Sequence, residues 1–261
     1  MNLINPSCLA AIALSGLALI SGCASTTASK ADPLEDLNRA TYAFNDKVDE
    51  AVFKPVAKGY QTITPEFFRA GVTNLFTNIG DVATALNNLL QGKPGDAASD
   101  AGRFLVNSTL GVLGLFDVAT PMGLDKHDED FGQTLGKWGV NSGPFLMIPL
   151  MGPSTLRDAV GRPVDSYAGY FRYVDRIPLR NSAFGLELID LRAHLLGASS
   201  TLDTAALDKY QFIRDAYLQR RLRSIYDGKV PQEKLDQLED DLVPPKSDLK
   251  LDAKDPTDSK K

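Results

Sequence analysis

A stretch of nineteen residues without a charged side chain, Trp138 to Leu156, limits what this chain can fold into more than any other feature. Its length is close to the about 20 apolar residues of a membrane-spanning helix. Six helix-breaking residues nevertheless exclude a continuous helix: Gly139, Gly143, Pro144, Pro149, Gly152 and Pro153. Because surface loops are ordinarily polar, an apolar loop of this length has to be buried in protein or to face lipid or a lipid-like ligand.

The N-terminus is typical of a bacterial lipoprotein signal peptide. Residues 1–22 carry no charge, contain an apolar run over 9–20, and end in Ile20-Ser21-Gly22 before Cys23, which resembles a lipobox. We therefore predict a signal peptide over 1–22 and lipidation of Cys23, with an ordinary secretory signal as the alternative. The start codon is left open, because no Lys or Arg precedes the apolar run. Ala24 rather than Asp follows the cysteine, which favours sorting to the outer membrane of a Gram-negative cell.

Composition excludes several classes of function. Cys8 leaves with the predicted signal peptide and Cys23 is consumed by the lipid, so the mature chain has no disulfide and no thiol chemistry. The formal net charge of −5 argues against nucleic-acid binding. Hydrophobic residues make up 43% of the chain, enough for one sizeable packed domain. A triacylated cysteine would anchor this domain firmly to a membrane.

The predicted organisation is one helical domain over 32–243, between a lipidated tether at 23–31 and a disordered, mixed-charge tail at 244–261. The first helix is expected to start at Asp32-Pro33, with Asp32 as the N-cap and Glu35 completing a capping box.

Apolar residues at helical spacing, bounded by Gly, Pro and capping residues, predict the other helices. These are expected from Thr64-Pro65 to Gly80, from Asp81 to Gly92, from Pro94 to about 105, over 154–171, around 184–195, over 203–227 and over 231–242. Apart from a short extended pair around 145–149, no alternating strand pattern stands out. The predicted class is all-α.

Residues that could carry catalysis are few, and an enzyme is not expected. The chain has no G-x-S-x-G elbow, and Ser154 in Gly152-Pro153-Ser154 is better explained as a helix N-cap. His127 lies in an HDED run over 127–130, which favours a solvated acidic turn over a metal site. For His194 a place in solvent or at an interface is expected. Arg220, Arg221 and Arg223 cluster near a helix C-terminus, where cations are favoured and a phosphate contact is a minor alternative. No cofactor is expected.

Strong apolar stripes, the charge-free stretches at 104–116 and 138–156 and the lipid anchor together suggest helices that lie in a bilayer. Non-helical backbone at membrane depth must line a cavity or be buried in protein. The broken segment at 138–156 would then border a pore or cavity.

Several motifs, in order, resemble those of the MlaA family, also called VacJ lipoproteins. They are DPLEDLNRATYAFND (32–46), KPVAKGY (54–60), NLFTNI (74–79), LLQGKP (89–94), GRFLVNSTLGVLGLFD (102–117), HDEDFGQTLGKWGV (127–140) and GPSTLRDAVGR (152–162). The resemblance runs from about Asp32 to Asp227, nearly the whole predicted folded part.

This resemblance implies a ring of helices in the inner leaflet of the outer membrane, around a central amphipathic channel. The implied function is removal of mislocalised phospholipids from the outer leaflet and their transfer to a periplasmic carrier, MlaC. Trimeric porins of the OmpC/OmpF kind are the implied membrane partners. The direction of transport comes from the resemblance alone.

The resemblance also points to candidate channel or hinge residues: Phe44, Asn45, Gly139, Gly143, Pro144 and Phe145. Phe44-Asn45 belongs to a family motif expected near the channel, with plain helix packing as the alternative. Gly139 and Gly143 match a glycine-rich stretch of the family, which Asn141 and Ser142 interrupt here.

Two other functions are open. A structural lipoprotein could scaffold a porin or envelope complex without moving lipid, and lipid held inside the protein would separate the two. An anchored phospholipase is disfavoured by the missing nucleophile motif.

Overall fold

The computed structural model describes residues 29–168 and 174–243, so the predicted signal peptide, Cys23 and the predicted tail lie outside the described residues. The helices are α2 (Glu35–Val48), the π-helix η1 (Asp49–Phe53), α3 (Lys54–Ile63), α4 (Glu66–Leu90), α5 (Pro94–Thr109), α6 (Phe131–Lys137), α7 (Leu156–Ala168), α8 (Ile177–His194), α9 (Leu196–Ala205), α10 (Lys209–Ile225) and α11 (Gln232–Leu242). One antiparallel hairpin joins β1 (Phe145–Ile148) to β2 (Gly152–Thr155). The predicted all-α class is confirmed, with this hairpin as its small addition.

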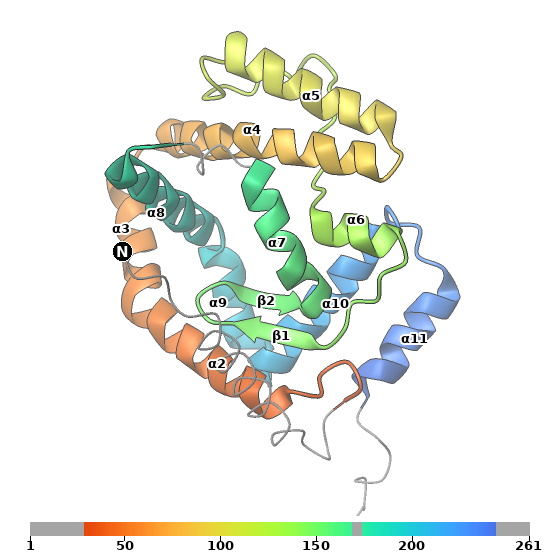
Figure 1. Cartoon of the computed structure of the whole chain (residues 1–261). Helices are drawn as coiled ribbons and strands as arrows, with labels where there is room; N and C mark the ends of the chain where they lie inside the picture. Colours follow the sequence, from red (N-terminus) through yellow and green to blue (C-terminus); the bar gives the residue numbers. More distant parts are fainter. Residues whose placement is uncertain (1–28, 169–173, 244–261) are drawn as a thin grey trace, which may run out of the picture.

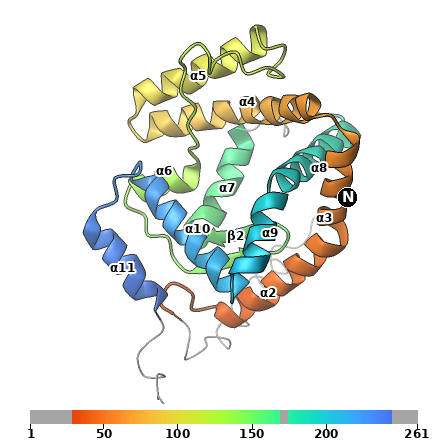
Figure 2. The same cartoon turned by 180° about the vertical axis from the view of Figure 1, so that it is seen from behind.

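The helices form a ring around the hairpin (Figure 1). Helices α2, η1 and α3 make one curved arm, α4 and α5 lie as an antiparallel pair across one end, and α8, α9 and α10 close the ring behind (Figure 2). A buried carboxylate ties three of these elements together. Asp190 of α8 accepts hydrogen bonds from Tyr60 of α3 at 2.9 Å and from Thr73 of α4 at 2.7 Å. His194, four residues later, is mostly exposed, as expected.

The N-terminal arm departs from the predicted capping. Leu34 precedes α2 and no side chain caps the helix. Asp32 is instead fully buried, where it accepts hydrogen bonds from Asn38 at 2.7 Å and from the Tyr210 hydroxyl. The capping-box prediction was wrong because the side chains of Asn38 and Tyr210, and not the backbone N–H groups of α2, donate the hydrogen bonds to this carboxylate.

The π-helix η1 comes directly before Pro55. Widening the helix there relieves the clash between a proline ring and the carbonyl one turn earlier.

The predicted break at Gly80 was wrong, because α4 runs through it as one helix. A glycine inside a helix costs only about 1 kcal/mol, which packing can offset. Five buried polar side chains in the second half of α4 supply that packing: Asn78, Asp81, Thr84, Asn87 and Asn88. One of them, Asn88, donates to Asp100 of the neighbouring α5 at 2.8 Å.

Two other predicted boundaries were also wrong. The expected helix over 203–227 is two helices, and Asp208 caps the second by accepting from the backbone N–H of Gln211 at 3.1 Å. The expected cap Ser154 lies in β2 instead, and Thr155 accepts from the backbone N–H of Asp158 at 3.2 Å.

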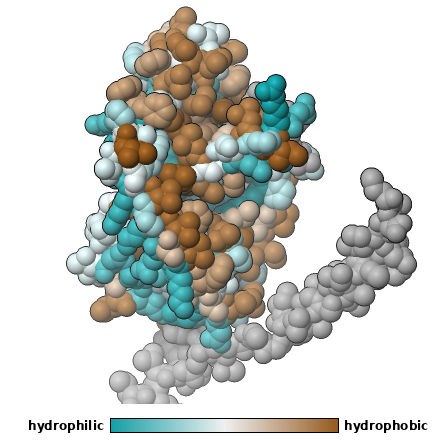
Figure 3. Space-filling view, turned by 90° about the vertical axis from the view of Figure 1, so that its left-hand side faces the viewer, coloured by the Kyte–Doolittle hydropathy of each residue, from teal (hydrophilic) through white to brown (hydrophobic). Residues whose placement is uncertain are grey.

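Much apolar surface stays outside the core. The buried hydrophobic cluster around the hairpin is small and centres on Phe145, Met147, Tyr210 and Leu218. Large exposed side chains include Ile63 and Phe67, 80% and 79% exposed, and Leu113, 73% exposed. Figure 3 shows apolar residues gathered over the upper and middle parts of one face. In the described part of the chain, no helix has the length and hydropathy needed to cross a membrane.

Candidate functional site

The hairpin at the centre of the ring is held by two asparagines of α2. Asn38 donates to the carbonyl of Phe145 at 3.0 Å and accepts from the N–H of Met147 at 2.8 Å. Asn45 donates to the carbonyl of Ile148 at 3.0 Å and accepts from the N–H of Leu150 at 2.8 Å. Asn38 therefore takes the place of a strand partner along β1, Asn45 bonds the end of β1 and the turn after it, and the pair aligns the hairpin with α2.

A cavity of about 380 Å³ lies between this hairpin, the α2–η1 arm and helices α8 to α10. We call it the ring cavity. Its lining is divided. The hairpin and α8 contribute mainly apolar side chains, among them Met147, Leu150, Met151, Leu188, Leu191 and Leu195. The arm made by α2, η1 and α3, the end of α9 and the start of α10 contribute most of the charged ones, including Asp46, Asp49, Glu50, Lys54, Asp203 and Lys209. A site with one apolar and one charged wall suits an amphiphile better than a polar metabolite.

Two ion-pair systems organise the charged wall. Arg192 of α8 binds both carboxylate oxygens of Asp49, at 2.6 and 2.7 Å, and donates to Ser199 at 3.0 Å. Hydrogen bonding to Asp49, against the opposing effect of burial, raises the pKa of Arg192, so the guanidinium stays charged. The second system centres on Asp203, which pairs with Lys209 at 2.6 Å and with Lys54 at 3.5 Å.

The candidate channel residues fall into different places. Asn45 lines the ring cavity as well as holding the hairpin turn. Phe44 does not line it and is 52% exposed, because the next residue along a helix points about 100° away. Phe145 is 0% exposed and packs edge-on against Tyr210 and Tyr217, with ring centroids 6.2 Å apart in each case. Neither Phe44 nor Phe145 lines the ring cavity, and Phe145 belongs to the core that anchors the hairpin. Their assignment as channel or hinge residues stays a prediction.

The remaining candidates lie on the loop between α6 and β1, outside the lining of the ring cavity. Gly139 and Gly143 have φ of 90° and 66°, in the left-handed region that favours glycine. Pro144 leads into β1, and its carbonyl accepts from the N–H of Leu156 at 3.1 Å. A hinge at these two glycines stays a prediction.

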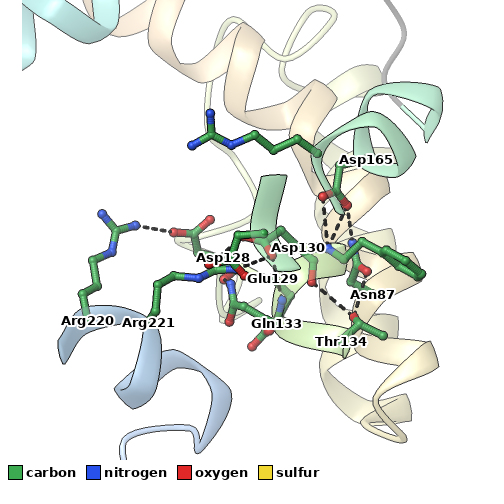
Figure 4. Close-up of polar contacts among 12 residues, drawn as sticks. Asn87, Asp128, Glu129, Asp130, Gln133, Thr134, Asp165, Arg220 and Arg221 are labelled. Carbon is green, nitrogen blue, oxygen red and sulfur yellow. Dashed lines mark hydrogen bonds and ion pairs between the residues drawn. The ribbon is translucent and has the colours of Figure 1, made fainter. Parts of the chain in front are cut away.

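The acidic run at 127–130 is mostly structural rather than solvated, and only Asp128 is highly exposed. Asp130 caps α6 and forms a two-point ion pair with Arg221, at 2.6 and 2.9 Å (Figure 4). Burial acts to raise the pKa of Asp130, but the hydrogen bonds from Arg221 outweigh it and the pKa is lowered. Arg221 also reaches Asp158 of α7 at 2.8 Å, and therefore joins α6, α7 and α10.

The same cluster extends to α4 through Asp165 of α7. Asp165 accepts from Asn87 at 2.9 Å and from the backbone N–H of Phe131 at 3.0 Å (Figure 4). His127 lies against Asp100 of α5 at 3.1 Å. Over residues 29–168 and 174–243, no group of three or more His, Cys, Asp or Glu side chains is arranged to hold a metal ion. Arg221, one of the three arginines considered for a phosphate contact, is already paired with the carboxylates of Asp130 and Asp158.

The sequence did not lead us to expect a functional role for Asn38 or Arg192. Asn38 and Asn45 share one face of α2 at a spacing of seven residues, which is a signal visible in the sequence. Arg192 gave no such signal, because its partner Asp49 lies 143 residues away.

Comparison with known proteins identifies the family of this chain. The family model described as MlaA lipoprotein matches residues 30–224. The intermembrane phospholipid transport system lipoprotein MlaA of Escherichia coli is 35% identical over 233 residues, covering 86% of this chain and 92% of the relative. An uncharacterized protein of Rickettsia bellii is 34% identical over 74% of this chain and 76% of its own length.

A solved structure reported as "Structural basis for maintenance of bacterial outer membrane lipid asymmetry" has a similar fold. It aligns with a TM-score of 0.67 at 33% identity, covering 74% of this chain and 98% of the solved one. With most of its folded part matched by the family model and by these relatives, the chain belongs to the MlaA lipoprotein family.

Proposed function

We propose that this protein is an outer-membrane lipoprotein that removes mislocalised phospholipids from the outer leaflet and so maintains lipid asymmetry. The observation that carries the proposal is the ring cavity, with one apolar and one charged wall. Acyl chains would contact the leucine and methionine side chains of α8 and the hairpin, and the headgroup would contact the charged wall. The role of the Escherichia coli relative in intermembrane phospholipid transport supports this reading.

The exposed apolar side chains support a position in the membrane. They gather at the junction of α3 and α4, in the turn after α5 and at the start of α8: Ile63, Phe67, Phe68, Leu110, Val112, Leu113, Phe116, Ile177, Leu179 and Phe184. Contiguous apolar patches on a protein surface mark contacts with membranes or partners. With a lipid on Cys23, the ring would lie in the inner leaflet of the outer membrane and open toward the periplasm.

The path of a lipid follows from that position. Phospholipid would enter from the outer leaflet, pass through the ring and leave to a soluble periplasmic carrier that resembles MlaC. A trimeric porin of the OmpC/OmpF kind would hold the ring in the membrane. In this scheme the protein is a passive conduit rather than an enzyme. The loop that contains Gly139 and Gly143 would supply mobility near the channel.

The test is labelling of surface phosphatidylethanolamine on intact cells with an impermeant amine reagent. Deletion of the gene should increase the label, wild-type protein should restore it, and Cys23→Ala should not. Leu202 lines the ring cavity, whereas its neighbour Thr201 is exposed and does not. Leu202→Trp should therefore fail to restore asymmetry and Thr201→Trp should succeed.

Unchanged label after deletion, in a strain with no redundant pathway, would contradict the proposal and favour a porin scaffold. Equal rescue by Leu202→Trp and Thr201→Trp would show that lipid does not pass through the ring cavity. Lysophospholipid release by the purified protein would point instead to a phospholipase.

A further inference from the structure

The ion pair between Arg192 and Asp49 joins α8 to η1, and both residues line the ring cavity. Neither side chain is sealed from the cavity, since Arg192 is 13% exposed and Asp49 is 28% exposed. A two-point guanidinium–carboxylate pair has the geometry that a phosphate oxygen pair can also satisfy. Arg192 is therefore held, charged and oriented, by a partner that a phosphodiester could replace.

The charge of the whole lining favours one type of headgroup. Four carboxylates face the ring cavity, from Asp46, Asp49, Glu50 and Asp203. Three cations face it, from Lys54, Arg192 and Lys209. The lining therefore has a formal charge of −1 (four negative groups against three positive ones). Asp49 and Glu50 are adjacent in the sequence, and in the described part of the chain no ion pair engages Glu50.

We propose that the ring cavity selects zwitterionic phospholipids, whose phosphate replaces Asp49 on Arg192 while their ammonium group binds the carboxylates of Asp49 and Glu50. This inference rests on the proposed function and adds the headgroup class to it. The exchange conserves charge, because the Arg192–Asp49 pair opens and two new ion pairs form, one between the phosphate and Arg192 and one between the ammonium group and the carboxylates of Asp49 and Glu50.

An anionic headgroup with a single phosphate cannot complete this exchange. Its phosphate could still bind Arg192, but Asp49 would lose its cation and stay beside Glu50 in a partly buried site. Removing one partner of such a pair is destabilising because it leaves a charge uncompensated. The preference therefore depends on what happens to Asp49, and not on Arg192 alone.

The test uses the full-length lipidated protein, purified from membranes in detergent and exchanged into vesicles of equal parts phosphatidylethanolamine and phosphatidylglycerol with matched acyl chains. Lipid that stays bound after re-isolation is quantified by mass spectrometry. The wild-type protein should hold phosphatidylethanolamine over phosphatidylglycerol by about fivefold, the factor that about 1 kcal/mol gives.

Three variants isolate the cause. Asp49→Asn and Glu50→Gln together should bring the ratio to about one or reverse it, because the groups that bind ammonium are lost. Arg192→Gln should lower the amount of both lipids. Asp128→Asn removes a carboxylate from an exposed ion pair with Arg220, outside the ring cavity, and should leave the ratio unchanged.

The outcomes separate this inference from the proposed function. If the wild-type protein retains both lipids in the proportion of the vesicles, headgroup selection is wrong while lipid binding stands. If it retains neither lipid, the proposed function fails as well. Should the double variant fold poorly, the wild-type ratio still decides the matter, and an unchanged ratio in a folded double variant would overturn the role of the carboxylates.

Discussion

Asn38 and Asn45, two turns apart on α2, each hold the central hairpin by one donated and one accepted hydrogen bond. Asn38 is buried and meets β1, whereas Asn45 is half-buried and meets the turn after it. The two contacts therefore differ in what they stabilise. Asn38 fixes the position of the hairpin in the core, and Asn45 fixes the part of it that borders the ring cavity.

Asn38→Leu should lower the free energy of unfolding by about 1–3 kcal/mol, because the carbonyl of Phe145 and the N–H of Met147 lose their partner in a buried site. Asn45→Leu should have a smaller effect, because solvent can reach the turn. Urea unfolding of the purified variants measures both. Equal decreases in the free energy of unfolding of the two variants would show that the burial of Asn38 does not increase its contribution to stability.

Arg221→Leu should destabilise the protein by about 3 kcal/mol, since it leaves the carboxylate of Asp130 without its cation and removes one of the two cations at the buried Asp158, which then keeps only Arg157. The adjacent Arg220 is the matched control. It is exposed and pairs with the exposed Asp128, so Arg220→Leu should change stability by less than about 0.5 kcal/mol. Thermal unfolding followed by circular dichroism measures the difference between the two variants.

Asp81 predicts a particular pH dependence. Burial raises its pKa to about 6 from the ordinary value of 3.8, despite the opposing charges of Lys126 and Arg103. Between these two values the folded protein binds a proton that the unfolded chain releases, so this group makes stability fall as pH rises from about 4 to about 6. Asp81→Asn should remove that part of the slope. Urea unfolding at intervals across this range tests it, and parallel wild-type and variant profiles would contradict it.

The two loop glycines predict a defect in transport. Val at both Gly139 and Gly143 should impair removal of surface phospholipid, because each position has a positive φ that a β-branched residue adopts only with strain. Gly139→Asn is the control, since Asn tolerates this conformation and a Cβ there meets nothing within 4 Å. Labelling of surface phosphatidylethanolamine is the readout, compared at equal amounts of folded protein. Normal labelling in the double Val variant would remove the hinge assignment.

The structure confirms what local patterns in the sequence can predict. Apolar side chains at helical spacing gave the all-α class, and Gly92 with Pro94 separated α4 from α5 as expected. The breakers within 138–156 correctly excluded one long helix, and the short extended pair expected around 145–149 is β1. These features depend on residues within a turn or two of one another, so the sequence alone contains them.

Where local and distant partners compete, only the tertiary structure decides. The residues around Asp32 have the pattern of a helix N-cap, but Asn38 and Tyr210 donate hydrogen bonds to its carboxylate in the core. Gly80 was expected to end a helix, but packing of the buried side chains around it stabilises α4 as one continuous helix.

The lining of the ring cavity could not be predicted from the sequence, because its ion pair joins Asp49 to Arg192, which are 143 residues apart. Nothing in the spacing of either residue indicates the other. The sequence by itself determined that this chain is helical, lipoprotein-like and unusually apolar in its loops. Which charges face the cavity was decided by the closing of the ring, which brings distant side chains within hydrogen-bonding distance.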